Sequence, residues 1–212
     1  MDEEKIKEIV EQVVEKFMQD NNKTIPVSPS NRHIHLSQDI QDILFGKNYS
    51  LKKSKDLSQP GQFACEETVR IIGPKAVLEK VRILGPLRKQ TQVEISITDA
   101  RIIGVENVPI RDSGDLDNTP GILIVGPKGS VQIEKGVIIA LRHIHMTTAE
   151  AESFNLKDKE TVKVKIASKR PLIFENVLIR VSDSFALDMH IDIDEGNAAG
   201  IAPGDCGTII KI

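Results

Sequence analysis

The stretch Arg32-His-Ile-His-Leu-Ser37 decides the fold, because it returns farther along the chain as Arg142-His-Ile-His-Met-Thr147. Side chains two residues apart in a β-strand point to the same face. Each His-x-His pair therefore predicts a short strand that presents two imidazoles side by side. A repeat of this kind also predicts two domains that arose by internal duplication.

A second repeat supports the same division of the chain. Val93-Glu-Ile-Ser-Ile-Thr-Asp99 has the same pattern as Met189-His-Ile-Asp-Ile-Asp-Glu195, and Glu94 aligns with His190 when the two repeats are superposed. Short alternating runs such as Thr161-Val-Lys-Val-Lys-Ile166 fill much of the remaining chain, and Gly-Pro turn clusters separate them. Many short strands with such turns are typical of small barrels. We expect a mainly β protein with short helices, built as two similar small β-barrel domains.

The domain boundaries follow from these repeats. Residues 1–22 are expected to form an N-terminal amphipathic helix and linker, because Lys5 to Met18 place apolar side chains at steps of three and four. Residues 23–139 are assigned to the first β-barrel domain and residues 140–212 to the second. A short helix is expected from Gly73 to Arg82, where a proline lies near the start and Val77, Leu78 and Val81 have helical spacing.

Composition narrows the classes of function. The 212 residues carry 28 basic and 31 acidic side chains, a formal net charge of −3, which disfavours binding to nucleic acid or to an anionic membrane. Two cysteines, Cys65 and Cys206, are too few for a disulfide framework. No apolar run approaches the ~20 residues of a transmembrane helix, and the acidic start MDEEK lacks the basic region of a signal peptide. We therefore expect a cytoplasmic protein.

The histidines predict a metal centre. The chain has five histidines, and all of them lie in three strand-like segments: His33, His35, His143, His145 and His190. Glu94 lies on the polar face of its own segment and is a candidate carboxylate ligand. Sites built from histidine and carboxylate leave a position for water or substrate, whereas structural zinc sites as a rule close with cysteines. The pattern favours a catalytic metal, with zinc first and cobalt, iron or manganese as alternatives.

Arg88 is a candidate for anion binding. It lies in the loop Gly85-Pro-Leu-Arg-Lys-Gln-Thr-Gln92, just before Glu94. The planar guanidinium matches the oxygens of phosphate, so an arginine near a metal suits phosphate delivery. An exposed loop arginine is more often simply solvated, and the residues alone leave both interpretations open.

Four separated motifs, taken together and in this order, resemble the PduL-type phosphate propanoyltransferases, the phosphotransacylases of propanediol utilisation. The resemblance covers residues 26 to 212. It rests on Ser30-Asn-Arg-His-Ile-His-Leu-Ser37, Gly85-Pro-Leu-Arg-Lys-Gln-Thr-Gln-Val-Glu94, Arg142-His-Ile-His-Met146 and Asp188-Met-His-Ile-Asp-Ile-Asp-Glu-Gly-Asn-Ala198.

This resemblance implies a fold and an activity. The fold is a pair of β-barrels that exchange a strand near residues 23–35. The activity is the reversible, zinc-dependent transfer of a short acyl group, propanoyl first, between coenzyme A and phosphate. Phosphate held by the metal and by an arginine attacks the thioester directly, without an acyl-enzyme. The substrates are acyl-CoA, free coenzyme A, phosphate and acyl phosphate.

The resemblance also implies roles for individual residues. One zinc ion would be held by His33, His35 and Glu94, and a second by His143, His145 and His190. Arg88 is the catalytic residue that binds phosphate. Further substrate contacts, to coenzyme A, are implied for Ser30, Asn31, Lys75, Arg82 and Asn197, of which Asn197 is an alternative ligand of the second zinc.

The sequence also suggests binding partners and two alternative functions. A homodimer is expected, and the N-terminal helix resembles those that dock microcompartment enzymes to a shell protein, with packing on the enzyme as the alternative. Two other classes stay open. The first is a cupin-like metal oxygenase or isomerase, which His143, His145 and Glu150 suggest and which would contain iron. The second is a non-catalytic module in which zinc staples the barrels, so that metal removal unfolds the chain.

Overall fold

The computed structural model describes residues 5–7, residue 10 and residues 24–210. Most of the predicted N-terminal amphipathic helix lies outside these residues, so the helix and its docking to a shell stay predictions. In the described part of the chain, no helix is long and apolar enough to cross a membrane. The mainly β architecture with short helices is confirmed.

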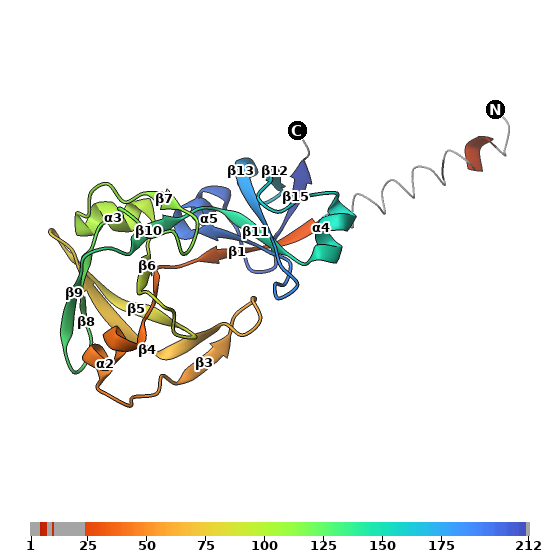
Figure 1. The fold of residues 1–212 in the computed structure, drawn as a ribbon. Helices are drawn as coiled ribbons and strands as arrows, with labels where there is room; N and C mark the ends of the chain where they lie inside the picture. Colours follow the sequence, from red (N-terminus) through yellow and green to blue (C-terminus); the bar gives the residue numbers. More distant parts are fainter. Residues whose placement is uncertain (1–4, 8–9, 11–23, 211–212) are drawn as a thin grey trace.

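The second half of the chain forms a closed barrel of six strands (Figure 1). Around the barrel these are β1 (Thr24–Ser30), β14 (Asp188–Asp192), β11 (His143–Met146), β13 (Leu172–Val181), β12 (Thr161–Ile166) and β15 (Cys206–Ile210). Alternation puts Ile144 and Met146 wholly inside, where they pack with Val164 and Ile179. Two helices belong to this half, α4 (Thr148–Phe154) and α5 (Ile193–Ala199).

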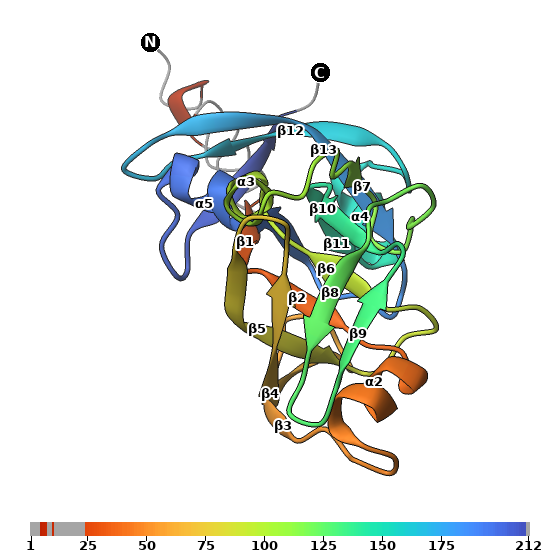
Figure 2. The ribbon, with the colours of Figure 1, turned by 90° about the vertical axis from the view of Figure 1, so that its left-hand side faces the viewer.

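The first half is a barrel-like sheet of nine strands whose two end strands do not pair with each other. Its strands run β7 (Ile110–Arg111), β10 (Val137–Ala140), β6 (Gln92–Glu94), β2 (His33–His35), β5 (Val77–Gly85), β4 (Phe63–Ile72), β8 (Ile122–Val125) and β9 (Ser130–Ile133), and β3 (Lys53–Asp56) pairs with β4. Figure 2 shows the β8–β9 hairpin beside β4, with α2 (Gln38–Phe45) near its end. A separate apolar core lies under this sheet and includes Ile34, Leu44, Ile83 and Ile124.

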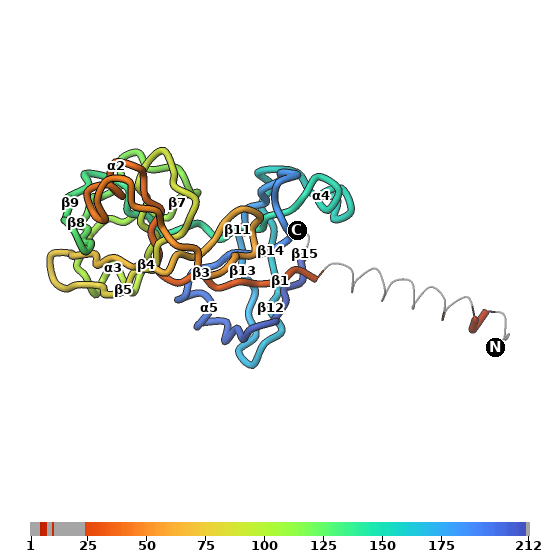
Figure 3. Tube along the Cα trace, turned by 90° about the horizontal axis from the view of Figure 1, so that it is seen from below, coloured from red at the N-terminus to blue at the C-terminus, as the bar shows by residue number. Residues whose placement is uncertain are grey.

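The two halves exchange strands in both directions. β1 comes just before the first His-x-His strand, yet it pairs with β14 of the second half, through Val27 and Met189. β10 comes just before the second His-x-His strand, yet it pairs with β6 of the first half, through Val137 and Val93. Figure 3 shows the two lobes, with β1 lying among the strands of the second. The division at residue 139 stays a prediction. β1 belongs to the first domain by its place in the sequence but to the second barrel by its pairing.

Each His-x-His strand has the same surroundings. β2 lies between parallel β5 and antiparallel β6, and β11 lies between parallel β13 and antiparallel β14. A helix follows each of these strands, α2 after β2 and α4 after β11, while α3 (Ile97–Ile103) follows β6 and α5 follows β14. This correspondence agrees with an internal duplication, which itself stays a prediction.

The expected helix from Gly73 to Arg82 is wrong. Gly73 and Ala76 form a turn, and Val77–Gly85 is strand β5. The register against β4 pairs Val69 with Val81 but Ile71 with Leu78, so β5 holds one extra residue there. Such a bulge separates two inward-facing side chains by three positions instead of two, which imitates helical spacing.

Candidate metal centre and active site

The first His-x-His strand and β6 bring together one candidate metal group. His33 pairs directly with Glu94 across β2 and β6, and His35 follows on the same face. The ligand atoms of the three side chains all lie within 4.8 Å of one another. His33 Nε2 is 3.4 Å from Glu94 Oε2, and the Glu94 side chain is 12% exposed.

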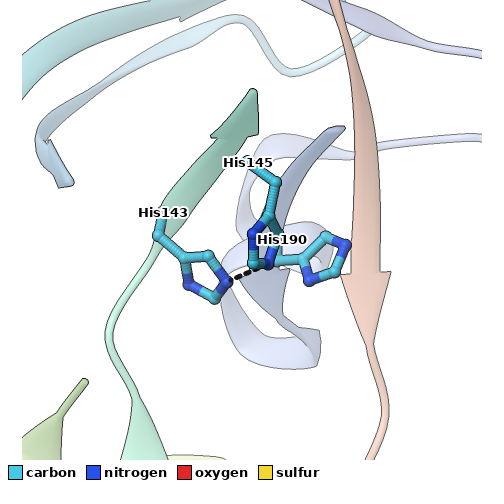
Figure 4. A group of neighbouring side chains, drawn as sticks. All are labelled: His143, His145 and His190. Carbon is cyan, nitrogen blue, oxygen red and sulfur yellow. Dashed lines mark hydrogen bonds between the residues drawn. The ribbon is translucent and has the colours of Figure 1, made fainter. Parts of the chain in front are cut away.

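The second His-x-His strand and β14 build the corresponding group. His143 pairs with His190 across β11 and β14, and His145 completes the set. The three rings face one another (Figure 4), and the Nε2 atoms of His143 and His145 are 3.0 Å apart. The structure therefore brings together both ligand sets that the sequence predicted.

Both groups fit a zinc ion. Zinc is held at ~2.0–2.1 Å by nitrogen and oxygen ligands in a tetrahedron, so two of its ligands lie about 3.3–3.4 Å apart. The separations of 3.4 Å in the first group and 3.0 Å in the second are close to that edge. Among the described residues, His35 Nδ1 and His145 Nδ1 are buried without a hydrogen-bond partner. Three protein ligands in each group leave a coordination position for another ligand.

Hydrogen bonds from the other ring nitrogen orient the histidine rings of the two groups. His33 Nδ1 lies 2.9 Å from the Asn31 carbonyl oxygen, and His143 Nδ1 lies 2.7 Å from that of Leu141. A carbonyl only accepts, so each Nδ1 carries the proton and each Nε2 keeps its lone pair for a metal. His190 Nε2 is 3.1 Å from Asp188 Oδ2, which leaves its other ring nitrogen available.

The titration of these groups suits metal binding. Burial, followed by the charge of a neighbouring histidine, lowers the pKa of His35 to about 3, that of His143 to about 4 and that of His145 to about 2. These imidazoles are neutral at pH 7 and can act as ligands. Burial alone would raise the pKa of Glu94, but His33 lowers it below its ordinary value. Burial would likewise lower the pKa of His33, but the Glu94 carboxylate raises it.

Both groups open into one pocket between the two halves of the chain. Its volume is about 680 Å³, and its lining includes all six candidate ligands. This size is within the range of small-molecule sites. Arg88 also lines it, as predicted, and its Nη1 donates to Ser113 Oγ at 3.1 Å. Burial lowers the pKa of Arg88 from its ordinary value.

A second arginine in the pocket was missed by the sequence analysis. Arg180 lies on β13 opposite His145, lines the pocket and stands with its guanidinium 5.8 Å from the centre of the Phe185 ring. Its charge also contributes to lowering the pKa of Arg88, so the two guanidinium groups are neighbours. Nothing in the sequence marks Arg180, because the pairing of β13 with the second His-x-His strand is not visible there.

The predicted contacts to coenzyme A divide into two groups. Ser30, Asn31 and Arg82 line the pocket, as does Lys55, which was not predicted. Lys75 lies instead in the β4–β5 turn, where its backbone N–H donates to Ile103, and Asn197 is exposed on α5. The pocket lining does not include Lys75 or Asn197, and their contact with coenzyme A stays a prediction.

Side chains from one half reach the other around the pocket. Gln59, which is 2% exposed, donates through Nε2 to the Ala186 carbonyl at 2.9 Å and accepts from the Ala186 N–H at 3.2 Å. Its neighbour Ser58 lies 3.3 Å from His190 Nε2. The carboxylate of Asp194, at the start of α5, accepts from the Thr98 backbone N–H at 2.8 Å. These contacts join the two halves of the chain on more than one side of the pocket.

Two paired arginines anchor the His-x-His strands at their starts. Arg32 makes an ion pair with Asp99 at 2.9 Å, and Arg142 makes one with Glu195 at 3.0 Å. Each acid is also the third residue of its helix, α3 or α5, and closes a capping box there. Glu150, which suggested the cupin pattern, closes the capping box of α4 with Thr147 and belongs to neither metal group.

Comparisons with known proteins agree with the geometry. Residues 26–202 match the family model of the phosphate propanoyltransferases. A protein of Alkaliphilus metalliredigens named phosphate propanoyltransferase is 52% identical over 100% of both chains. A Thermotoga maritima protein of the same name is 56% identical over 88% of this chain and 89% of its own, and one from Listeria monocytogenes is 48% identical over 100% and 98%.

Proposed function

Since the chain belongs to the phosphate propanoyltransferase family, we propose that its pocket transfers a propanoyl group between coenzyme A and phosphate with the help of two bound zinc ions. The observation that carries the proposal is the meeting of two three-ligand groups and two arginines in one pocket of about 680 Å³. Zinc and the path of the reaction go beyond what the family name states.

The six ligand side chains would hold the metal. His33, His35 and Glu94 would bind one zinc ion, and His143, His145 and His190 the other. When bound, zinc supplies a Lewis acid that polarises a carbonyl or phosphoryl oxygen. The protein contributes three imidazoles that are neutral at pH 7, those of His35, His143 and His145, and an ionised carboxylate. Backbone carbonyls already orient the rings of His33 and His143.

Arg88 and Arg180 would bind the phosphate. Two guanidinium groups that face one half-buried pocket repel each other, and a dianion between them removes this repulsion. The planar fork of an arginine can hold two phosphate oxygens, and two forks that share one oxygen leave the fourth oxygen free to react. Holding phosphate beside the thioester carbonyl replaces a bimolecular encounter by a positioned one, which is the main contribution that positioning can make.

The bond changes need no covalent intermediate with the protein. A phosphate oxygen forms a bond to the thioester carbonyl carbon, the carbon–sulfur bond breaks, and the sulfur leaves as the thiolate of coenzyme A. Neither cysteine can serve as a nucleophile, because Cys65 is buried in the core of the first half and Cys206 lies outside the pocket lining. Trapping of acylated protein from acyl-CoA without phosphate would contradict this mechanism.

The rim of the pocket suits a phosphorylated cofactor. Lys55 and Arg82 are exposed there and can meet the phosphates of coenzyme A, while Ser30 and Asn31 offer polar contacts beside the first metal group. Two Arg82 hydrogen bonds, to the Cys65 and Glu66 carbonyls at 2.8 and 2.9 Å, fix its direction. A homodimer, and a location inside a microcompartment, stay predictions.

The test is phosphate-dependent release of free coenzyme A from propanoyl-CoA. We compare the zinc-loaded enzyme, a chelator-treated sample, the Arg88→Ala variant and a matched control, Lys89→Ala, which removes an exposed cation from the next position of the same loop. We expect release to be lost on chelation and restored by zinc. It should fall by at least about 100-fold without Arg88, as for the loss of a preorganised charge-stabilising group, and persist without Lys89. No release by zinc-loaded protein would refute the proposal.

A further inference from the structure

We propose that Ser113 is a positioning residue that fixes Arg88 and the metal ligand Glu94 relative to each other. This inference deepens the proposed function and rests on it. Ser113 lies in the loop after β7, outside the helices and strands, and neither its type nor its place in the sequence marks it. Its hydroxyl nevertheless contacts the two side chains on which the proposed phosphate site and first metal group depend.

The hydroxyl of Ser113 has every hydrogen-bonding position filled. It accepts from Arg88 Nη1 at 3.1 Å and from Gln92 Nε2 at 2.8 Å. Both of these groups only donate, so the single proton of the hydroxyl is left for Glu94 Oε1, at 3.1 Å. The direction of each bond is therefore determined, and Ser113 cannot rotate without losing one of them.

Gln92 supports the same arrangement from inside the protein. Its side chain is 1% exposed, and its Oε1 accepts from the Gly114 N–H at 2.8 Å. Because that backbone group only donates, the amide nitrogen of Gln92 must point the other way, where it donates to Glu94 Oε1 at 2.5 Å. Oε1 of Glu94 thus receives two hydrogen bonds, and Oε2 is left to face His33, where it would bind the proposed metal.

The neighbouring residue holds the other arginine. Asp112 Oδ1 is 3.6 Å from Arg180 Nη1, and Asp112 Oδ2 accepts from Lys159 at 3.1 Å. Two successive residues of one loop therefore contact the two arginines of the pocket, one from each half of the chain. This loop therefore connects the two guanidinium groups through Ser113 and Asp112.

The experiment compares Ser113→Ala with Ser113→Thr, which keeps the hydroxyl, and with Ser130→Ala, an exposed serine on β9 outside the pocket lining. We expect Ser113→Ala to raise the KM for phosphate about tenfold, in keeping with a lost hydrogen bond to a charged group. The KM for propanoyl-CoA should change less. Zinc affinity of one of the two sites should fall about 10- to 100-fold, as for lost second contacts, measured by chelator competition.

A double-substitution test separates positioning from general damage. If Ser113 acts on phosphate through Arg88, then at a zinc concentration that saturates both sites, adding Ser113→Ala to Arg88→Ala should raise the phosphate KM no further. Ser113→Thr should show the wild-type phosphate KM and the wild-type zinc affinity. If Ser113→Ala does not fold, Ser113→Gly takes its place in both measurements. A wild-type phosphate KM in Ser113→Ala, or a second, additive rise in the double variant, would overturn the inference.

The outcomes distinguish this inference from the proposed function. An active wild type with an unaltered Ser113→Ala variant refutes only the role of Ser113. A zinc-loaded wild type that releases no coenzyme A refutes the proposed function. In that case chelator competition still decides the link to Glu94: weaker binding at one site supports it, and wild-type binding at both sites overturns it.

Discussion

Replacing Gln59 by alanine should destabilise the protein by about 2–3 kcal/mol. The side chain is 2% exposed and makes two hydrogen bonds to the backbone of Ala186, across the boundary between the halves. A typical internal hydrogen bond contributes about 0.5–1.5 kcal/mol net, and a buried partner left unpaired costs about 1–3 kcal/mol more. Ala186 is only half-buried, so water can replace some of the hydrogen bonds that its backbone loses. The expected loss in the free energy of unfolding is therefore smaller than the sum of these contributions.

The assay is equilibrium urea unfolding of chelator-treated protein, so that bound metal does not add to the measured stability. Gln38→Ala is the matched control, because Gln38 is exposed on α2 and its loss should change stability by no more than about 0.5 kcal/mol. A Gln59→Glu variant keeps the size of the side chain but places a buried carboxylate oxygen against the Ala186 carbonyl oxygen, and should be at least as unstable as Gln59→Ala at neutral pH. If Gln59→Ala is no less stable than the control, the two bonds do not join the halves as described.

Two further predictions concern titratable groups. Of the two cysteines, Cys206 is exposed and should react with a thiol reagent in the native protein at pH 8. Cys65 should react only after unfolding, because it is buried and burial raises its pKa to about 11. Two fast-reacting thiols in the native protein would contradict this prediction. The metal-free protein should lose stability as the pH falls from about 6.5 toward about 4. The unfolded chain takes up protons on His35, His143 and His145 in that range while the folded chain, with their pKa values lowered to about 3, 4 and 2, does not. His33, whose pKa is raised, opposes this trend in part. Thermal melting of chelator-treated protein at pH 7.5 and pH 5 checks the sign, and a melting temperature that is equal or higher at pH 5 would contradict it.

The metal ligands could be predicted from the sequence because they depend on local periodicity. Side chains two apart share a face in any strand, so His33 and His35 had to point together once the segment was extended. The grouping of His33 with Glu94 and of His143 with His190 came from the resemblance to a known family rather than from any local signal. Resemblance to a known family then supplied the role of Arg88.

The parts that were missed depend on contacts between distant segments. Arg180, Gln59 and Ser113 gain their places only when β13, the β3–β4 loop and the loop after β7 meet at the pocket. The error at Gly73 to Arg82 has a local cause, since Lys80 takes a positive φ of 55° within β5 and the bulge disturbs the alternation. A single extra residue there made a strand look helical.

The reciprocal exchange of strands has a consequence for how the chain is made. β1 is synthesised long before its partner β14, since Val27 pairs with Met189. The six-stranded barrel therefore cannot close until β14 has been made. Nor can a gene cut between the His-x-His motifs yield two complete halves, because the first piece would carry β1, which belongs to the barrel of the second. The second metal group, on β11 and β14, therefore depends on a strand that is made with the first half of the chain.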